Sequence, residues 1–204
     1  MQSNVLIQSD SDSRPIFVID ACDRVLFAND AWLEMMSLDD RAPSALTAVL
    51  GRSVWEFRPG GLVRQLWEVL YRRVRGIGGQ IFVPMRADTA RERRLFEIEL
   101  SLLPEHAVRH VCECVWSERR PEVALLDPSR ARGTRVLSRC DWCARVQVRP
   151  GFWAEVEEAQ ALLGIAREEP FPTLSSVACA TCEQAVLQTF PLAWPSSGLQ
   201  PRPR

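Results

Sequence analysis

The chain has 204 residues, 47% of them hydrophobic, and a formal net charge of −1. This length can hold one medium domain and one small domain, and the near-neutral charge does not predict binding to nucleic acid or to a membrane surface. All 25 basic residues are arginine, which excludes lysine Schiff-base chemistry and a phosphate-binding loop ending in Gly-Lys-Ser/Thr. No apolar run reaches the roughly 20 residues that cross a bilayer, and the polar start lacks the order of a secretion signal, so we expect a cytoplasmic protein.

The first quarter of the chain predicts two short strands and a capped helix. Residues 1–13 are polar and are expected to be disordered. Apolar strands are predicted at residues 15–20 and 25–28, with a turn between them. Asn29 and Asp30 then supply capping side chains for a helix over residues 31–36.

The next segment predicts a long amphipathic helix and a sheet. After the break at residues 59–61, apolar side chains recur on one helical face up to the glycines at 76, 78 and 79. This apolar face comprises Val63, Leu66, Trp67, Leu70 and Val74. Strands are predicted at residues 80–85, 94–103 and 107–116, and their clean alternation predicts an antiparallel sheet with one buried face.

Two stretches carry a resemblance to PAS domains. IFVIDACDRVLFANDAW resembles the PAS opening, with a strand, a turn containing Asp, a second strand and an Asn that begins a helix. VPMRADTARERRLFEIELSLLP resembles the closing strands of a bacterial PAS subgroup, with Arg86-Ala87-Asp88 where that subgroup carries Arg-Cys-Asp. The resemblance spans about residues 14–117 and implies an α+β fold, a five-stranded antiparallel sheet with flanking helices. It also implies a bacterial signalling protein.

Two Cys-x-x-Cys pairs, Cys140/Cys143 and Cys179/Cys182, predict a metal site. One pair can place both sulfurs about 2.3 Å from a single ion, and a second pair completes a tetrahedron. Two disulfides or a redox dithiol are the alternatives, but the chain has seven cysteines, an odd number, and no secretion signal. A structural four-cysteine Zn²⁺ site is therefore the favoured interpretation.

The same region resembles a segment that follows PAS or receiver domains in bacterial signalling proteins. The matching residues are Cys140, Trp142, Cys143, Gly151, Trp153, Glu157, Glu158, Cys179 and Cys182. The Ser-His-Gly turn of that segment is replaced by residues 175–177, and its Cys-Pro-x-Cys proline by Ala180. We expect a linker over residues 118–137 and a treble-clef-like zinc module over 138–190, with a hairpin at 139–148 and helices at 152–163 and 179–190. A disordered tail is expected over 191–204.

Candidates for a ligand site inside the PAS domain are few. Trp67, His110, Cys112 and Cys114 could face a bound ligand, and His110 could ligate haem. Core packing is the simpler interpretation of Trp67, Cys112 and Cys114, and a locally hydrogen-bonded sheet histidine is that of His110. No catalytic set of Ser, Cys, His and Asp can be assembled from the spacing, so no catalytic residue and no enzymatic activity are expected.

The predicted function is that of a signal-transduction sensor or adaptor. The PAS domain would sense a ligand or mediate dimerisation, and the zinc module would present a surface to a signalling protein. The alternative is a nucleic-acid-binding transcriptional regulator, because six arginines lie between Arg130 and Arg149. The simpler interpretation of those arginines is a solvated linker that also offsets thiolate charge, so nucleic acid is not an expected partner.

Overall fold

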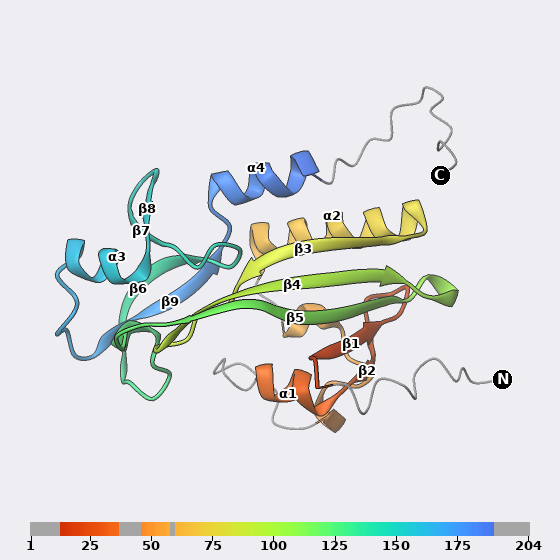
Figure 1. Cartoon of the computed structure of the whole chain (residues 1–204), viewed down its shortest axis with the longest axis horizontal. Helices are drawn as coiled ribbons and strands as arrows, with labels where there is room; N and C mark the ends of the chain where they lie inside the picture. The colour runs from red at the N-terminus through yellow and green to blue at the C-terminus, as the bar shows by residue number, and fades with distance from the viewer. Residues whose placement is uncertain (1–12, 37–45, 58–59, 190–204) are drawn as a thin grey trace.

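A computed structural model describes residues 13–36, 46–57 and 60–189. It contains two sheets, one built from the N-terminal part of the chain and one from the C-terminal part (Figure 1). The predicted disorder of residues 1–13 and 191–204 lies outside the described residues, apart from Ser13.

The first sheet has five antiparallel strands in the order β2-β1-β5-β4-β3. In chain order they are β1 (Ile16–Ile19), β2 (Val25–Ala28), β3 (Gln80–Arg86), β4 (Glu92–Leu102) and β5 (Val108–Arg119). The alternation read from β4 holds, since Phe96, Ile98 and Leu100 are buried and Glu97 is exposed. The predicted five-stranded antiparallel sheet with flanking helices is therefore confirmed.

Two helices of the N-terminal domain form where the sequence predicts them. Asn29 begins α1 (Asp30–Met36), and its Oδ1 accepts the backbone N–H groups of Trp32 at 3.0 Å and Ile16 at 2.9 Å. One side chain thus caps the helix and ties it to β1. The long α2 (Gly61–Ile77) buries its apolar face and ends at Gly78, whose φ of 67° is the left-handed conformation that glycine adopts readily. Short 3₁₀ turns at Leu46–Ala48 and Val54–Glu56 lie between the two helices.

The second sheet has four strands in the order β8-β7-β6-β9. They are β6 (Arg132–Cys140), β7 (Val146–Arg149), β8 (Phe152–Ala154) and β9 (Phe171–Val177). The predicted hairpin is formed by β6 and β7, but β6 also pairs in parallel with β9, which the sequence analysis missed. Residues 152–154 form a strand, so α3 (Val156–Leu162) is shorter than the predicted helix over residues 152–163. The last helix is α4 (Ala180–Thr189).

Residues 118–137, predicted as a linker, form regular secondary structure. The strand β5 continues to Arg119, a 3₁₀ turn forms at Ala124–Leu126, and β6 begins at Arg132. Val123 and Leu125 are 3% and 0% exposed and belong to a core beneath the second sheet, not to the first sheet. Burying these side chains removes apolar surface from water, which is why an arginine- and proline-rich segment is nevertheless ordered.

The two sheets are joined by a continuous core. Cys140, Trp142, Cys179 and Val186 from the C-terminal part pack in the same apolar cluster as the side chains of α2 and the first sheet. The C-terminal module is therefore docked on the N-terminal domain, and the predicted boundary between two separate units is a packed interface. Among the described residues, no helix has both the length and the apolar character needed to span a membrane.

Candidate metal centre

The first cysteine pair lies on a tight turn between β6 and β7. The backbone N–H of Cys140 donates to the carbonyl of Arg145 at 2.8 Å, and that of Ala144 donates to the carbonyl of Cys140 at 2.9 Å. Ala144 has a φ of 60°, a left-handed conformation that an alanine adopts only at a cost. We call residues 140–145 the knuckle. Its turn places the sulfurs of Cys140 and Cys143 on the same side.

The second pair reaches the knuckle because β9 runs beside β6. Cys140 is in register with Val177, the last residue of β9, and the chain then turns into α4. The backbone N–H of Cys179 donates to the Sγ of Cys140 at 3.3 Å. The parallel pairing of two strands far apart in sequence therefore brings the second cysteine pair to the first.

The four sulfurs have the spacing of a tetrahedral metal site. The Sγ atoms of Cys140, Cys143, Cys179 and Cys182 all lie within 4.8 Å of one another. Those of Cys143 and Cys179 are 3.9 Å apart. A tetrahedron with metal–sulfur distances of about 2.3 Å has edges of about 3.8 Å. The cluster can therefore hold a metal ion.

The pKa values of the cluster cysteines indicate that a cation would stabilise their thiolate forms. Sulfur–sulfur hydrogen bonds with Cys143 and Cys182, together with the backbone N–H of Cys179, hold the pKa of Cys140 far below its ordinary value. The Cys140 sulfur in turn raises the pKa of Cys143 to about 12, and Cys140 and Cys143 raise that of Cys182 well above its ordinary value. Without a cation, Cys143 and Cys182 therefore keep their protons. A bound metal would allow all four groups to become thiolates.

One side of the cluster faces the N-terminal domain. The ring of Trp142, in the knuckle, lies 5.8 Å from the ring of Trp67 on α2, centroid to centroid. The carbonyl of Trp142 accepts the backbone N–H of Arg86, at the end of β3, at 2.8 Å. On the other side, Arg145 has a raised pKa, chiefly because it donates to Glu155 and also because it lies near Cys143 and Cys179. Arg145 therefore lies where its charge can offset that of thiolates, whereas burial lowers the pKa of Arg139, the other arginine expected in this role.

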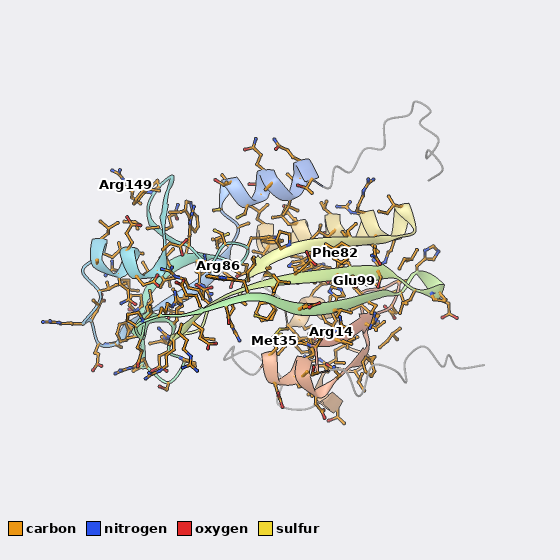
Figure 2. All side chains as sticks on the ribbon, viewed as in Figure 1. Arg14, Met35, Phe82, Arg86, Glu99 and Arg149 are labelled. Atoms are coloured by element: carbon orange, nitrogen blue, oxygen red, sulfur yellow. The ribbon has the colours of Figure 1, made fainter. Side chains whose placement is uncertain are left out.

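A cluster of charged residues joins the two domains beside the knuckle. We call it the junction cluster; it comprises Arg86, Asp88, Arg120, Glu155 and Glu157. Its central cation, Arg120, has a side chain only 4% exposed and contacts Asp88 at 3.3 Å and Glu157 at 2.9 Å. Arg86, which lies where the first sheet meets the C-terminal module (Figure 2), donates to Asp88 at 2.9 Å and to Glu155 at 3.2 Å.

The sequence analysis noted Arg86 and Asp88 only as part of the PAS resemblance and did not find the junction cluster. Arg120 fell within the predicted linker. The short spacing of Arg86 and Asp88, next to a strand, was the available signal. The structure assigns both residues a role in holding the C-terminal module.

The candidate ligand residues inside the N-terminal domain lie in packed surroundings. His110 is fully buried, with its ring stacked 3.9 Å from that of Phe17 and edge-on to that of Tyr71 at 5.2 Å. Trp67 is also buried, and its ring centroid lies 6.0 Å from that of His110. Cys112 is buried and Cys114 is exposed, because the apolar cover ends along β5. Aromatic side chains thus surround Trp67 and His110, and Cys112 belongs to the same buried core.

Most of the arginines that motivated the nucleic-acid alternative contact other groups of the protein. Arg132 donates to the carbonyls of Leu125 at 3.0 Å and Asp127 at 2.8 Å, and Arg135 pairs with Glu168 at 3.0 Å. Burial lowers the pKa of Arg139. Arg130 pairs with Asp127, Glu122 and Glu169, and Arg149 lies over the ring of Phe152. Arg130, Arg132 and Arg135 are therefore held by acidic or carbonyl groups of the same chain.

Comparisons with known proteins give structural similarities only. No family model and no curated protein matches the chain. The PAS domain of BvgS from Bordetella pertussis is similar, with 20% identity and a TM-score of 0.45, over 54% of this chain and 83% of that one. A domain of a sensory box sensor histidine kinase/response regulator from Geobacter sulfurreducens has 16% identity and a TM-score of 0.39, over 51% and 85%. A C-terminal domain from Streptococcus mutans has 10% identity and a TM-score of 0.37, over 52% of this chain and 78% of that one.

The fold assignment rests on the strand order and register of the structure, and these similarities add no weight to it. The five-stranded antiparallel sheet, the capped helix after β2 and the long helix before β3 give the N-terminal domain a PAS-like fold. A small module with a four-cysteine cluster is packed against it.

Proposed function

We propose that the chain is a signal-transduction adaptor that acts by binding another signalling protein and not by catalysis. Its PAS-like domain and its four-cysteine module work as one body. Pairing of two copies through the PAS-like domain is part of the same proposal. The observation that carries it is the contact between α2 and α4, which links the metal cluster to the core of the PAS-like domain.

Zn²⁺ is the ion proposed for the cluster. Four thiolates in a tetrahedral arrangement favour zinc among the common divalent ions. With all four positions filled by protein, zinc would supply structural stability and would leave no position for a reactive water. The four cysteines would hold the ion, the knuckle and the start of α4 would be fixed relative to each other, and Arg145 would offset part of the charge.

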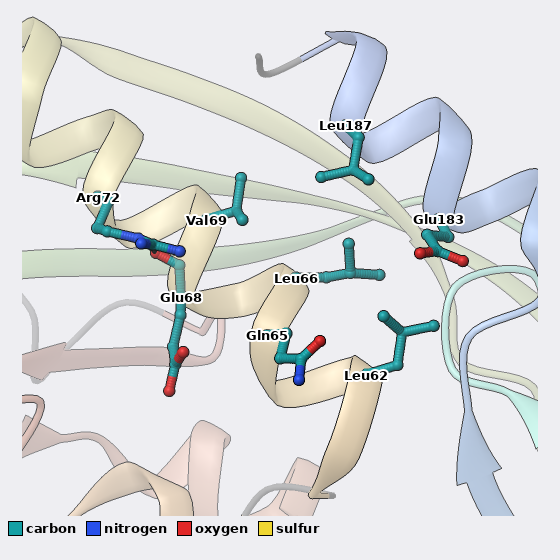
Figure 3. Close-up of a pocket in the computed structure, with 8 residues that line it drawn as sticks. All are labelled: Leu62, Gln65, Leu66, Glu68, Val69, Arg72, Glu183 and Leu187. Atoms are coloured by element: carbon teal, nitrogen blue, oxygen red, sulfur yellow. Dashed lines mark hydrogen bonds between the residues drawn. The ribbon is translucent and has the colours of Figure 1, made fainter. Parts of the chain in front are cut away.

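The α2–α4 contact gives the metal cluster a route to the PAS-like core. Cys182 lies in the first turn of α4, and Leu66 and Leu187 lie across from one another where α4 runs along α2 (Figure 3). Trp67 and Tyr71, also on α2, pack around His110. A shift of α4 would therefore be transmitted through one helix to the buried aromatic cluster.

Metal analysis and partner capture on the same protein test this proposal. The tagged chain is purified under reducing conditions from the cells that express it, with and without a zinc chelator in the buffers. We expect about one zinc ion per chain. We also expect a stoichiometric signalling partner that is retained by the zinc-loaded protein and lost after chelation. Protein isolated without metal, or a partner whose binding is indifferent to chelation, would contradict the proposal.

A further inference from the structure

The four cluster cysteines differ in their access to solvent. Cys140 and Cys179 are buried, whereas Cys143 and Cys182 are partly exposed. Thiolates held by a metal stay deprotonated, and the thiolate is the form of cysteine that reacts with oxidants. A small oxidant in solvent can therefore reach the cluster through Cys143 and Cys182.

Whichever of Cys143 and Cys182 reacts first, the sulfur of the other lies close to it. All four Sγ atoms lie within 4.8 Å of one another, so a disulfide needs only a local movement of the knuckle against the first turn of α4. We propose that Cys143 and Cys182 form an oxidant-sensing site, at which a hydroperoxide converts two metal-bound thiolates into a disulfide and releases the ion. This inference rests on the proposed zinc site.

The chemistry balances with hydrogen peroxide as the only oxidant. One thiolate attacks a peroxide oxygen, forming an S–O bond and breaking the O–O bond, so that a sulfenic acid forms and hydroxide leaves. The other thiolate then attacks the sulfenic sulfur, forming the S–S bond and displacing a second hydroxide. Both hydroxides take protons from solvent to become water. Two thiolates have lost two electrons, and the peroxide has gained them.

The structural consequence falls on the α2–α4 contact. A disulfide draws its sulfurs to about 2.05 Å, against about 3.8 Å along the edge of a zinc tetrahedron. Cys182 moves with α4, and Cys143 moves with the knuckle that carries Trp142. Oxidation therefore displaces α4, so that its Leu187 shifts relative to Leu66 of α2. It also changes the packing of Trp142 on Trp67.

The test uses a variant in which the other exposed thiols are absent. Cys22 and Cys114 are exposed and lie outside the cluster, so Cys22→Ser and Cys114→Ser together leave the four cluster thiols and the buried Cys112. The zinc-loaded full chain is treated with hydrogen peroxide while a chromogenic chelator reports free zinc. We expect release of the bound zinc in step with the loss of two thiols, a Cys143–Cys182 disulfide by peptide mapping, and recovery after a thiol reductant and zinc are added.

The outcomes separate this inference from the proposed function. Protein that holds no metal when freshly purified would contradict both the oxidant-sensing inference and the proposed function. If peroxide leaves zinc bound, or if the disulfide joins any other pair of cysteines, the oxidant-sensing proposal is wrong and the proposed structural zinc site is unaffected. Hydrogen exchange on the wild-type chain gives a second readout, with faster exchange in α4 expected after oxidation. Unchanged exchange in α4 would overturn the link to the α2–α4 contact.

Discussion

The ring of Trp142 packs against the ring of Trp67, with 5.8 Å between their centroids. Trp142 lies between two cysteines of the cluster, and Trp67 lies on the helix that covers the first sheet. Both side chains are buried, at 6% and 1% exposure. The pair is therefore the most direct contact between the metal cluster and the aromatic core of the PAS-like domain.

Replacing Trp142 with alanine should destabilise the whole chain. The change removes a large buried side chain and leaves a cavity against Trp67, which typically costs about 3–5 kcal/mol. Urea unfolding followed by far-ultraviolet circular dichroism measures this free energy. Trp116→Ala is the matched control, because Trp116 is 46% exposed and its loss should change stability by less than about 0.5 kcal/mol. Equal effects of the two substitutions would show that the Trp142 contact does not stabilise the protein.

The two domains should tumble together in solution. A continuous core and the junction cluster fix the C-terminal module to the first sheet, so amides in α4 and in β4 should report the same rotational correlation time by ¹⁵N relaxation. A shorter correlation time for the module would mean that it moves freely. That result would also remove the proposed route from the metal cluster to the PAS-like core.

The parts of the fold that were predicted are those encoded locally. The burial of alternate residues in β4 follows from a two-residue period, and the apolar face of α2 follows from a helical one. Asn29 marks a helix start because its short side chain can accept the first free backbone N–H groups. The cysteine cluster could be predicted because two residues between cysteines suit a shared ion.

The missed parts depend on contacts between distant segments. The strand β9 contains Pro172 and two serines, a weak strand pattern. It is held in place by parallel pairing with β6, whose paired residues lie 37 to 39 positions earlier in the chain. The ordered segment before β6 was read as a linker because Arg132 and its neighbours look solvated, although Arg132 donates to backbone carbonyls of that segment. Nor can spacing alone show that Arg120 meets Asp88 and Glu157.

Arg120 should be the most sensitive residue of the junction cluster. Its guanidinium faces the fully buried side chain of Asp88, so Arg120→Met leaves that carboxylate without one of its cations. Breaking a buried ion pair by removing one partner costs about 3–5 kcal/mol. Arg135→Met is the control, since Arg135 is 46% exposed and its pair with Glu168 should contribute about 0–1 kcal/mol.

A double substitution checks the cause of the Arg120 effect. Asp88→Asn removes the stranded charge, so Arg120→Met combined with Asp88→Asn should recover part of the lost stability. Urea unfolding of the four variants gives the coupling free energy between the two residues. Strictly additive losses would mean that the Arg120–Asp88 contact contributes little, and that Arg120 acts through packing.

Glu157 should contribute to the loss of stability in acid. Burial by itself raises the pKa of Glu157, but a backbone hydrogen bond and Arg120 outweigh it, so the pKa lies below its ordinary value of 4.5. A lowered pKa means that the carboxylate stabilises the fold above about pH 4.5, and that this contribution is lost as the pH falls through the folded-state pKa.

Glu157→Gln should therefore flatten the acid limb of the stability curve. Urea unfolding of both proteins between about pH 3 and pH 7 should show a free-energy difference that is constant at neutral pH and shrinks in acid. Glu169→Gln is the control, since Glu169 is 72% exposed and should leave the curve unchanged. Any loss of metal in acid affects wild type and variant alike. A difference that stays constant down to pH 3 would contradict the prediction.

Metal binding should release protons, because two of the ligand thiols are protonated without it. The Cys140 sulfur raises the pKa of Cys143 to about 12, and that of Cys182 is raised as well, so both thiols carry protons at neutral pH until a cation arrives. Displacing at least these two protons makes the apparent zinc affinity fall by about a hundredfold or more for each pH unit of acidification. Competition with a chromogenic chelator between about pH 6 and pH 8 measures this slope, and calorimetry in two buffers of different protonation enthalpy counts the protons.

The variant carrying Cys22→Ser and Cys114→Ser should give the same slope, since neither residue belongs to the cluster. An affinity that does not change with pH would mean that the thiols ionise without the metal, and that some other charge near the knuckle already compensates them.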